Sequence, residues 1–164
     1  MLPDWLGEPF ASKDNKLYLT RKVAKRLLSE AQEAFPYEYS ALLTGRGSTI
    51  SGYLSMPHNH DKHAFAWEGP TFLRALQKIR QTNIQWLGVL HTHPHTPPLP
   101  STSDHSGWHY PMLSYWILGL AAHQPEWQLY QWTNGAFEQR SYTIIDDSCS
   151  AGFASASSLS PKNS

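Results

Sequence analysis

A short apolar run that leads directly into two histidines most limits what this chain can fold into. The run is Trp86-Leu87-Gly88-Val89-Leu90, and His91-Thr92-His93 follows it at once. A run of this length and composition is typical of a buried strand. Because side chains alternate along a strand, His91 and His93 should point to the same face of the sheet. The sequence therefore predicts a sheet that presents two imidazoles on one face.

Helical segments are expected before and after this strand. Val23, Leu27, Leu28 and Ala31 recur at helical spacing, which predicts a helix over 21–34 with Thr20 as its N-cap and Pro36 beyond its end. Phe72, Leu73, Leu76 and Ile79 predict a second helix over 70–81. A third, short helix should begin near Ser101 or Thr102 and stop before Pro111.

The other apolar segments have the character of strands. Gly45-Arg46-Gly47 and Asn134-Gly135 are turn signals, and the second is typical of a hairpin. The strands predicted on either side of these turns and after the third helix are 39–44, 49–56, 115–120, 127–132 and 137–145. This order of elements indicates an α/β fold with a mixed, largely antiparallel sheet.

Length and composition fit one domain. The chain has 164 residues, of which 40% are hydrophobic, enough for a core. We expect a lead-in over 1–16, the domain over 17–146 and a disordered Ser/Ala-rich tail over 147–164. The segment 58–63 carries His58, His60 and His63, which we expect to be solvated loop residues rather than a second metal site.

Charge and cysteine content exclude several classes of protein. Lys plus Arg and Asp plus Glu both number 13, which argues against a partner such as nucleic acid or an anionic membrane. The single cysteine, Cys149, can form neither an intramolecular disulfide nor a thiolate-rich zinc site. The first residues carry acids and no apolar run, and 115–122 is too short to span a bilayer. We therefore expect a cytoplasmic protein.

Three side chains have the spacing of a catalytic metal site. Two histidines at i and i+2 on a strand lie about 7 Å apart at Cα, so both imidazoles can reach one ion. Asp104 supplies an oxygen ligand from the next element. Three protein ligands leave a fourth position open, as catalytic rather than structural zinc sites do. His91, His93 and Asp104 are thus the predicted ligands of one Zn²⁺ per chain.

Ser101 lies three residues before Asp104 and has two possible roles. If a helix begins at Ser101, the two side chains lie one turn apart on the same side, so the hydroxyl can face the metal site. Ser is also a common N-cap, and the two roles can coexist. The sequence leaves both open.

The complete string resembles the JAMM (MPN-plus) metallopeptidase family. That family's motif is an upstream Glu, then His-x-His-Pro, a fixed gap and Ser-x-x-Asp, which match His91-Thr92-His93-Pro94 and Ser101-Thr102-Ser103-Asp104 here. The stretch around the family's Glu resembles Pro36–Gly45, with Ala41 where the family commonly has Gly. The resemblance implies a single-domain, cytidine-deaminase-like (MPN) α/β sandwich with a curved sheet flanked by helices.

The resemblance also implies site roles. Glu38 would be the general acid/base and Ser101 would stabilise the oxyanion, while His91, His93 and Asp104 bind zinc. Glu33 is a nearby competitor for the role of Glu38, but it lies in the helical pattern, whereas Glu38 precedes an apolar strand. We therefore favour Glu38.

The implied reaction is hydrolysis of a peptide or isopeptide bond. Family members commonly cut after the C-terminal tail of a ubiquitin-like protein, and some small prokaryotic members act on a sulfur-carrier protein, so the resemblance implies a partner of this kind. A non-catalytic scaffold module of the same fold is the alternative, although here every motif position is filled. A DNA-repair-associated branch fits poorly with zero net charge, and a zinc nucleobase deaminase needs Pro-Cys-x-x-Cys. The sequence leaves the oligomeric state open.

Overall fold

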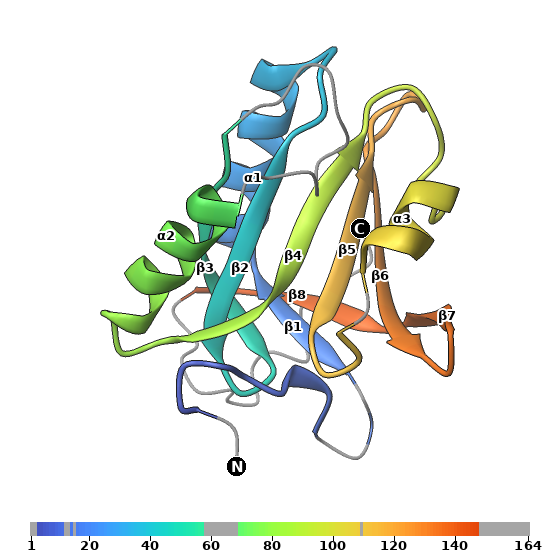
Figure 1. The fold of residues 1–164 in the computed structure, drawn as a ribbon. Coiled ribbons are helices and arrows are strands. Elements are labelled where there is room, and N and C mark those ends of the chain that lie inside the picture. The colour runs from blue at the N-terminus through green and yellow to red at the C-terminus, as the bar shows by residue number, and fades with distance from the viewer. Residues whose placement is uncertain (1–2, 12–13, 15, 58–68, 109, 148–164) are drawn as a thin grey trace.

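The computed structural model describes residues 3–11, 14, 16–57, 69–108 and 110–147. In this part of the chain, eight strands form one sheet, with three α-helices and one 3₁₀ turn (Figure 1). In chain order the elements are η1 (Pro9–Ala11), β1 (Leu17–Thr20), α1 (Arg21–Ala34), β2 (Ser40–Arg46), β3 (Thr49–Ser55), α2 (Gly69–Arg80), β4 (Gln85–His93), α3 (Thr102–Gly107), β5 (Ser114–Gly119), β6 (Glu126–Thr133), β7 (Ala136–Arg140) and β8 (Tyr142–Ile145).

The sheet is mixed and strongly curled. Its strand order is β7-β6-β5-β4-β2-β3-β1-β8. The pairs β4–β5, β3–β1 and β1–β8 are parallel, and the other neighbours are antiparallel. The two outermost strands, β7 and β8, are consecutive in the chain and separated only by Ser141. Because one residue spans so little distance, the two edges must approach each other, which curls the sheet. The predicted single α/β domain with a mixed, curved sheet is confirmed.

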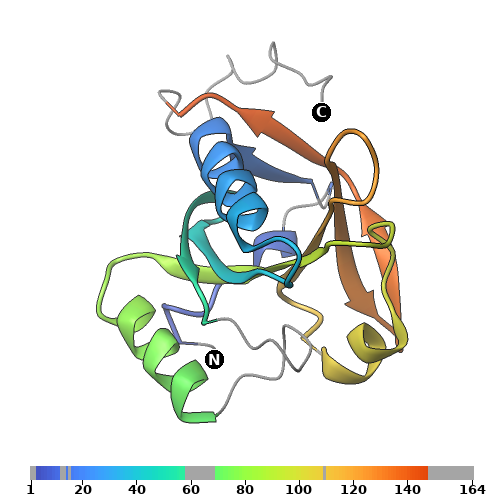
Figure 2. The same ribbon diagram turned by 90° about the horizontal axis from the view of Figure 1, so that it is seen from above.

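Helices cover both faces of this sheet (Figure 2). On one face α1 buries Val23, Leu27 and Ala31 against residues of β1, β2, β4 and β5. On the other face α2 buries Ala75 and Ile79 among side chains of β2, β4 and β5. Alternation along β5 shows the division, since Trp116 belongs to the α1 core while its neighbours face the α2 side.

The first helix begins and ends where its sequence predicts. Thr20 is the N-cap of α1, and its hydroxyl accepts the Val23 N–H. The Lys22 N–H, which also lies in the first turn of α1, donates to the Asp147 carboxylate at 2.8 Å. The helix ends at Ala34, two residues before Pro36, because a proline disfavours helical geometry in the residue before it.

Two features of the strands differ from the prediction. The segment predicted as one strand over 137–145 is in fact β7 and β8, so that prediction was wrong. The two parts pair at opposite edges of the sheet, and Ser141 breaks the run between them. Strand β1 was not predicted, because four residues give too short a pattern and both of its partners are distant in the chain.

Helix α3 and strand β4 agree with the prediction, whereas the histidine-containing loop and the tail are not tested. Helix α3 lies where a short helix was predicted, and β4 continues through both histidines. Most of the loop with His58, His60 and His63 and nearly all of the tail lie outside the described residues, and the bounds 17–146 stay a prediction. Among the described residues no helix is long and apolar enough to cross a membrane.

Candidate metal centre

The last residues of β4 bring two imidazoles together on the α2 side of the sheet. His91 and His93 are 2% and 7% exposed. Their Nε2 atoms lie 3.2 Å apart. The carboxylate of Asp104 reaches both rings, with Oδ1 3.0 Å from His91 Nε2 and Oδ2 3.3 Å from His93 Nε2. One ligand atom from each residue lies within 4.8 Å of the other two, so the three side chains can hold a metal ion.

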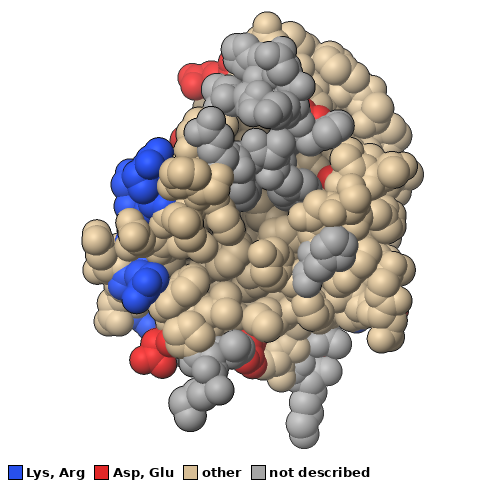
Figure 3. Space-filling model, in the orientation of Figure 1, with Lys and Arg blue, Asp and Glu red and all other residues tan. Residues whose placement is uncertain are grey.

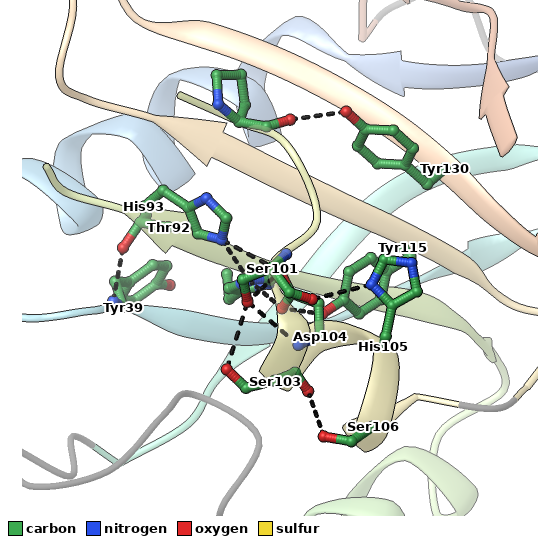
Figure 4. Close-up of polar contacts among 12 residues, drawn as sticks. Tyr39, Thr92, His93, Ser101, Ser103, Asp104, His105, Ser106, Tyr115 and Tyr130 are labelled. Atoms are coloured by element: carbon green, nitrogen blue, oxygen red, sulfur yellow. Dashed lines mark hydrogen bonds and ion pairs between the residues drawn. The ribbon is translucent and has the colours of Figure 1, made fainter. Parts of the chain in front are cut away.

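The start of α3 sets the position of Asp104. Ser101 is the N-cap, and its hydroxyl accepts the Asp104 N–H at 3.2 Å. The Ser101 N–H in turn donates to Asp104 Oδ2 at 2.7 Å, which completes a capping box (Figure 4). The Ser101 hydroxyl also donates to Oδ2 at 3.1 Å. The cap thus holds the carboxylate toward β4, and it accounts for the spacing of Ser101 and Asp104.

The proline-rich loop between β4 and α3 orients His93. Its Nδ1 lies 2.9 Å from the Pro97 carbonyl, so an Nδ1–H donated there leaves Nε2 as the ligand atom. The Tyr130 hydroxyl donates a hydrogen bond to the next carbonyl of the loop, that of Pro98, at 2.7 Å (Figure 4). The loop can pack close to β5 because residue 119 is a glycine. A Cβ at Gly119 would lie only 2.8 Å from Pro98 Cδ.

Tyr115 is a residue of the site that the sequence analysis missed. Its hydroxyl donates to Asp104 Oδ1 at 2.5 Å, and its ring centroid lies 5.3 Å from that of His91. The side chain is fully buried. Burial and the charge of Asp104 raise the pKa of Tyr115, so the phenol keeps the proton that it donates. The sequence predicts a strand that begins at residue 115, and alternation along this strand defines the face on which Tyr115 lies. That face could be related to the histidines only once β4 was known to pair with β5.

Glu38 lies just before β2, beside the histidines. The antiparallel register pairs Ser40 with His91, so continuing it places Glu38 level with His93. Two hydrogen bonds fix the intervening residues: the Tyr39 N–H donates to Thr92 Oγ1 at 2.8 Å, and the Thr92 N–H donates to the Tyr39 carbonyl at 2.9 Å. Glu38 as a residue is partly exposed. Its position fits a group that faces both the cluster and solvent.

Electrostatics link these groups. Burial alone would lower the pKa of His93, but hydrogen bonds to Asp104 and the Pro97 carbonyl, with the charges of Asp104 and Glu38, raise it above its ordinary value. Burial alone would likewise raise the pKa of Asp104. Hydrogen bonds from both histidines and from Tyr115, together with histidine charge, hold that pKa well below its usual range. Asp104 is therefore an anion.

The donor set fits zinc. Two imidazole nitrogens and one carboxylate oxygen are a known three-ligand combination for a catalytic zinc, and an orienting carbonyl on one histidine is the usual second partner. Here the ionised carboxylate and the Pro97 contact of His93 meet both conditions. The same set also suits other divalent transition metals, since imidazole and carboxylate bind several of them.

Glu33, the competitor of Glu38, and three aromatic or imidazole side chains of this region are not part of the ligand cluster. Glu33 is exposed on α1. His95 packs edge-on against Phe35, and His105 packs against Trp132. Trp108 is 3% exposed and belongs to the core on the α2 side.

Comparison with known proteins gives a consistent result. A family model described as prokaryotic homologs of the JAB domain matches residues 20–133. No curated protein matches the sequence. The solution structure of a protein from Desulfitobacterium hafniense is 25% identical, with a TM-score of 0.69, and the match covers 80% of this chain and 94% of that one.

Two other solved structures share the fold. A JAB1/MPN domain protein from Archaeoglobus fulgidus is 19% identical with a TM-score of 0.54, over 77% of this chain and 98% of that one. A structure described as a metalloprotease-like zinc site in the proteasome and signalosome, JAMM, is 20% identical with a TM-score of 0.50, over 77% and 96%. The family resemblance read from the motif is thus confirmed, and the chain belongs to the prokaryotic homologs of the JAB domain.

Proposed function

We propose that this chain is a zinc-dependent hydrolase that cuts a peptide or isopeptide bond after the C-terminal tail of a ubiquitin-like or sulfur-carrier protein. The observation that carries the proposal is the buried His91–His93–Asp104 cluster with the partly exposed Glu38 level with it. A purely structural zinc site usually has four protein ligands, whereas the cluster found among the described residues has three.

Each residue then has a defined task. His91, His93 and Asp104 would hold the ion, which when bound supplies Lewis-acid polarisation of the scissile carbonyl and a more acidic water. Glu38 takes the proton of the attacking water and returns it to the leaving amine. The Ser101 hydroxyl donates to Asp104 in the free protein, so it must rotate to donate to an oxyanion of the substrate.

Exposed apolar side chains near the site support a peptide substrate. Phe35 and Tyr37 precede Glu38 and are 48% and 46% exposed, and Leu99, just before Ser101, is 63% exposed. Apolar side chains together with a few polar groups commonly line ligand sites, so these three side chains are candidates to contact the tail. The identity of the tail and a cytoplasmic location remain predictions.

The first test is zinc content by elemental analysis. The wild type should hold about one zinc per chain, and His93→Ala should lose most of it. Asp104→Asn is a better second variant than Asp104→Ala, because an amide can still accept the Ser101 N–H and preserve the cap of α3. A wild type that holds no zinc after metal is added would contradict the hydrolase and leave a scaffold of the same fold.

The second test is cleavage of ubiquitin-like and sulfur-carrier proteins joined through their C-terminal tails to a reporter amine. Glu38→Gln should keep zinc and lose roughly 10²-fold or more in rate, as expected for removal of a general base. Glu33→Gln is the matched control and should cleave normally. Zinc-loaded wild type that cleaves none of these fusions would favour the scaffold reading, in which the cluster only stabilises the domain.

A further inference from the structure

A polar pocket lies at the opposite end of β4 from the metal ligands. Its volume is about 540 Å³, within the range of small-molecule sites. The lining residues are Asp4, Trp5, Arg46, Arg80, Thr82, Asn83, Ile84 and Gln85. Gln85 begins β4, and His91 follows six residues later, so the pocket and the metal ligands are separated by about 20 Å of extended strand.

Backbone pairing builds one wall of this pocket. The Trp86 N–H donates to the Trp5 carbonyl at 2.7 Å, and the Gly7 N–H donates to the Trp86 carbonyl at 3.0 Å. The Gln85 side chain is held at both ends: Oε1 accepts the Gly47 N–H at 3.1 Å, and Nε2 donates to the Asp4 carbonyl at 3.3 Å. The N-terminal segment is thus fixed to the sheet, which gives the pocket a rigid floor.

Two arginines face this pocket without an anionic partner. Within the described part of the chain, neither Arg46 nor Arg80 makes an ion pair with a carboxylate, although Asp4 lines the same pocket. The Arg80 guanidinium instead lies over the Trp5 ring, 5.8 Å from its centroid. Such a cation–π contact helps to position a guanidinium and uses none of its N–H groups as hydrogen-bond donors.

The surrounding surface is also cationic. Helix α2 carries Arg74, Lys78 and Arg80 and no acidic residue. In Figure 3 the Lys and Arg side chains on the visible face gather along the left side of the molecule, where Figure 1 draws α2. These cations favour the approach of an anion along α2, although Figure 3 also shows acidic side chains at the lower left and the whole chain has no net charge.

We propose that this pocket binds a small phosphate ester that carries hydroxyl groups. Two guanidinium groups match the oxygens of a phosphate, which arginine binds in pairs of parallel hydrogen bonds. The Asp4 carboxylate can only accept, so it suits a hydroxyl of the same ligand and disfavours a polyanion such as nucleic acid. Thr82 donates its hydroxyl hydrogen to the Ile79 carbonyl, so its oxygen is left as an acceptor for a second ligand hydroxyl.

The test is a titration followed by two-dimensional ¹H–¹⁵N NMR, with inorganic phosphate and ribose 5-phosphate as separate probes. We expect saturable shifts of the Gly47, Asn83 and Gln85 signals with both probes, and tighter binding of ribose 5-phosphate. Arg46→Gln and Arg80→Gln should each weaken both probes roughly tenfold, the usual loss for a charge-assisted hydrogen bond. Arg74→Gln, on the same helix but outside the pocket lining, is the matched control and should weaken both probes far less than either pocket variant.

Asp4→Asn separates the two halves of the proposal. It should tighten inorganic phosphate, because a negative charge is removed, and reduce the preference for ribose 5-phosphate. Shifts that do not saturate, or that persist unchanged in the Arg46→Gln/Arg80→Gln double variant, would overturn the site. Equal tightening of both probes in Asp4→Asn would overturn the hydroxyl contact. Neither result depends on zinc or on cleavage activity.

Discussion

Asp104 carries more structural tasks than any other side chain of the site. Its Oδ2 accepts two hydrogen bonds from Ser101, and its Oδ1 accepts one from Tyr115, while both oxygens also face the histidines. A carboxylate held by this many donors stays ionised and has few orientations left to lose when it binds a cation. At the residue scale, the geometry of the site therefore depends on Ser101 and Tyr115, which orient Asp104, as well as on the three ligands themselves.

Tyr115→Phe should weaken metal binding without unfolding the domain. The change removes one hydroxyl that donates to Asp104 and leaves the ring stacked on Phe137, with centroids 4.6 Å apart. Loss of one such outer partner typically costs about tenfold or more in metal affinity. Competition of the protein with a coloured chelator for zinc measures the affinity directly.

Tyr142→Phe provides the control for this prediction. Tyr142 also packs in an aromatic pair, with Trp116, but its ring belongs to the core on the α1 side, away from the ligands. It should leave the zinc affinity unchanged. If Tyr115→Phe binds zinc as tightly as the wild type, then the hydroxyl only satisfies a buried carboxylate and does not position it.

The sequence alone predicted the candidate metal ligands, but it did not predict the groups that form hydrogen bonds with them. His91, His93 and Asp104 stand out because their spacing is itself the signal. Tyr115 and the Pro97 carbonyl have no such spacing, because they meet the ligands only through the pairing of β4 with β5 and the path of the loop. Such contacts follow from tertiary geometry, which no local pattern encodes.

At the scale of elements, the tight contact between β5 and the proline-rich loop predicts a second effect. Gly119→Ala would place a Cβ 2.8 Å from Pro98 Cδ, so the loop must shift. Overpacking of this kind costs about 1–3 kcal/mol. The shift should also move the Pro97 carbonyl from His93 and lower zinc affinity.

Chemical denaturation and chelator competition, run on the same sample, check both parts of this prediction. Gly135→Ala is unsuitable as a control because its φ is +81°, a backbone conformation that alanine resists. Gly69→Ala, at the start of α2 with open space around it, should change neither quantity. Unchanged zinc affinity in a destabilised Gly119→Ala would show that the loop does not orient His93.

Helix α1 is tied to β3 by a carboxylate whose titration should be visible in stability. Burial alone would raise the pKa of Glu30, but hydrogen bonds from Ser55, Tyr53 and Tyr39 and the charge of Arg26 lower it below its ordinary value of 4.5. A lowered pKa in the folded state stabilises the protein above about pH 4.5, and this contribution is lost as the pH falls through the folded-state pKa.

Glu30→Gln should therefore destabilise the protein by about 1 kcal/mol at pH 7, because the site is partly solvated and the charge-assisted bonds are screened. The difference from wild type should shrink below about pH 4.5. Urea unfolding at a series of pH values measures it. Glu33→Gln, on the same helix but exposed, should show no such trend. A difference that is constant with pH would mean that the charge contributes nothing.

At the scale of the whole molecule, the curled sheet depends on a strand that local patterns did not reveal. Helices α1, α2 and α3 were predicted because periodicity and caps are local signals. Strands β1 and β8 are four residues each and pair with each other across more than a hundred residues of chain, so their existence depends on the finished sheet. The fold class was predictable from the sequence, whereas the placement of β1 and β8 at one edge of the sheet was not.

Removal of β8 should therefore destabilise the whole domain. A chain that ends at Arg140 loses the pairing of β1 with β8, the buried Ile145 and the Asp147 contact to the first turn of α1. Burial of one such side chain contributes about 1.5–3 kcal/mol, and the exposed edge of β1 adds unpaired backbone groups. We expect this chain to melt at least about 10 °C lower than the full chain, since about 2 kcal/mol is already worth several degrees in a domain of this size.

A chain that ends at Asp147 is the matched control, because it keeps every contact of β8 among the residues that the structure describes. Differential scanning calorimetry of the three lengths gives the comparison. The 147-residue chain should melt with the full chain, which places the loss in β8 rather than in the residues beyond it. If the chain that ends at Arg140 melts as high as the other two, then the rest of the sheet is stable without β8. The packing of α1 would then depend on its core contacts alone.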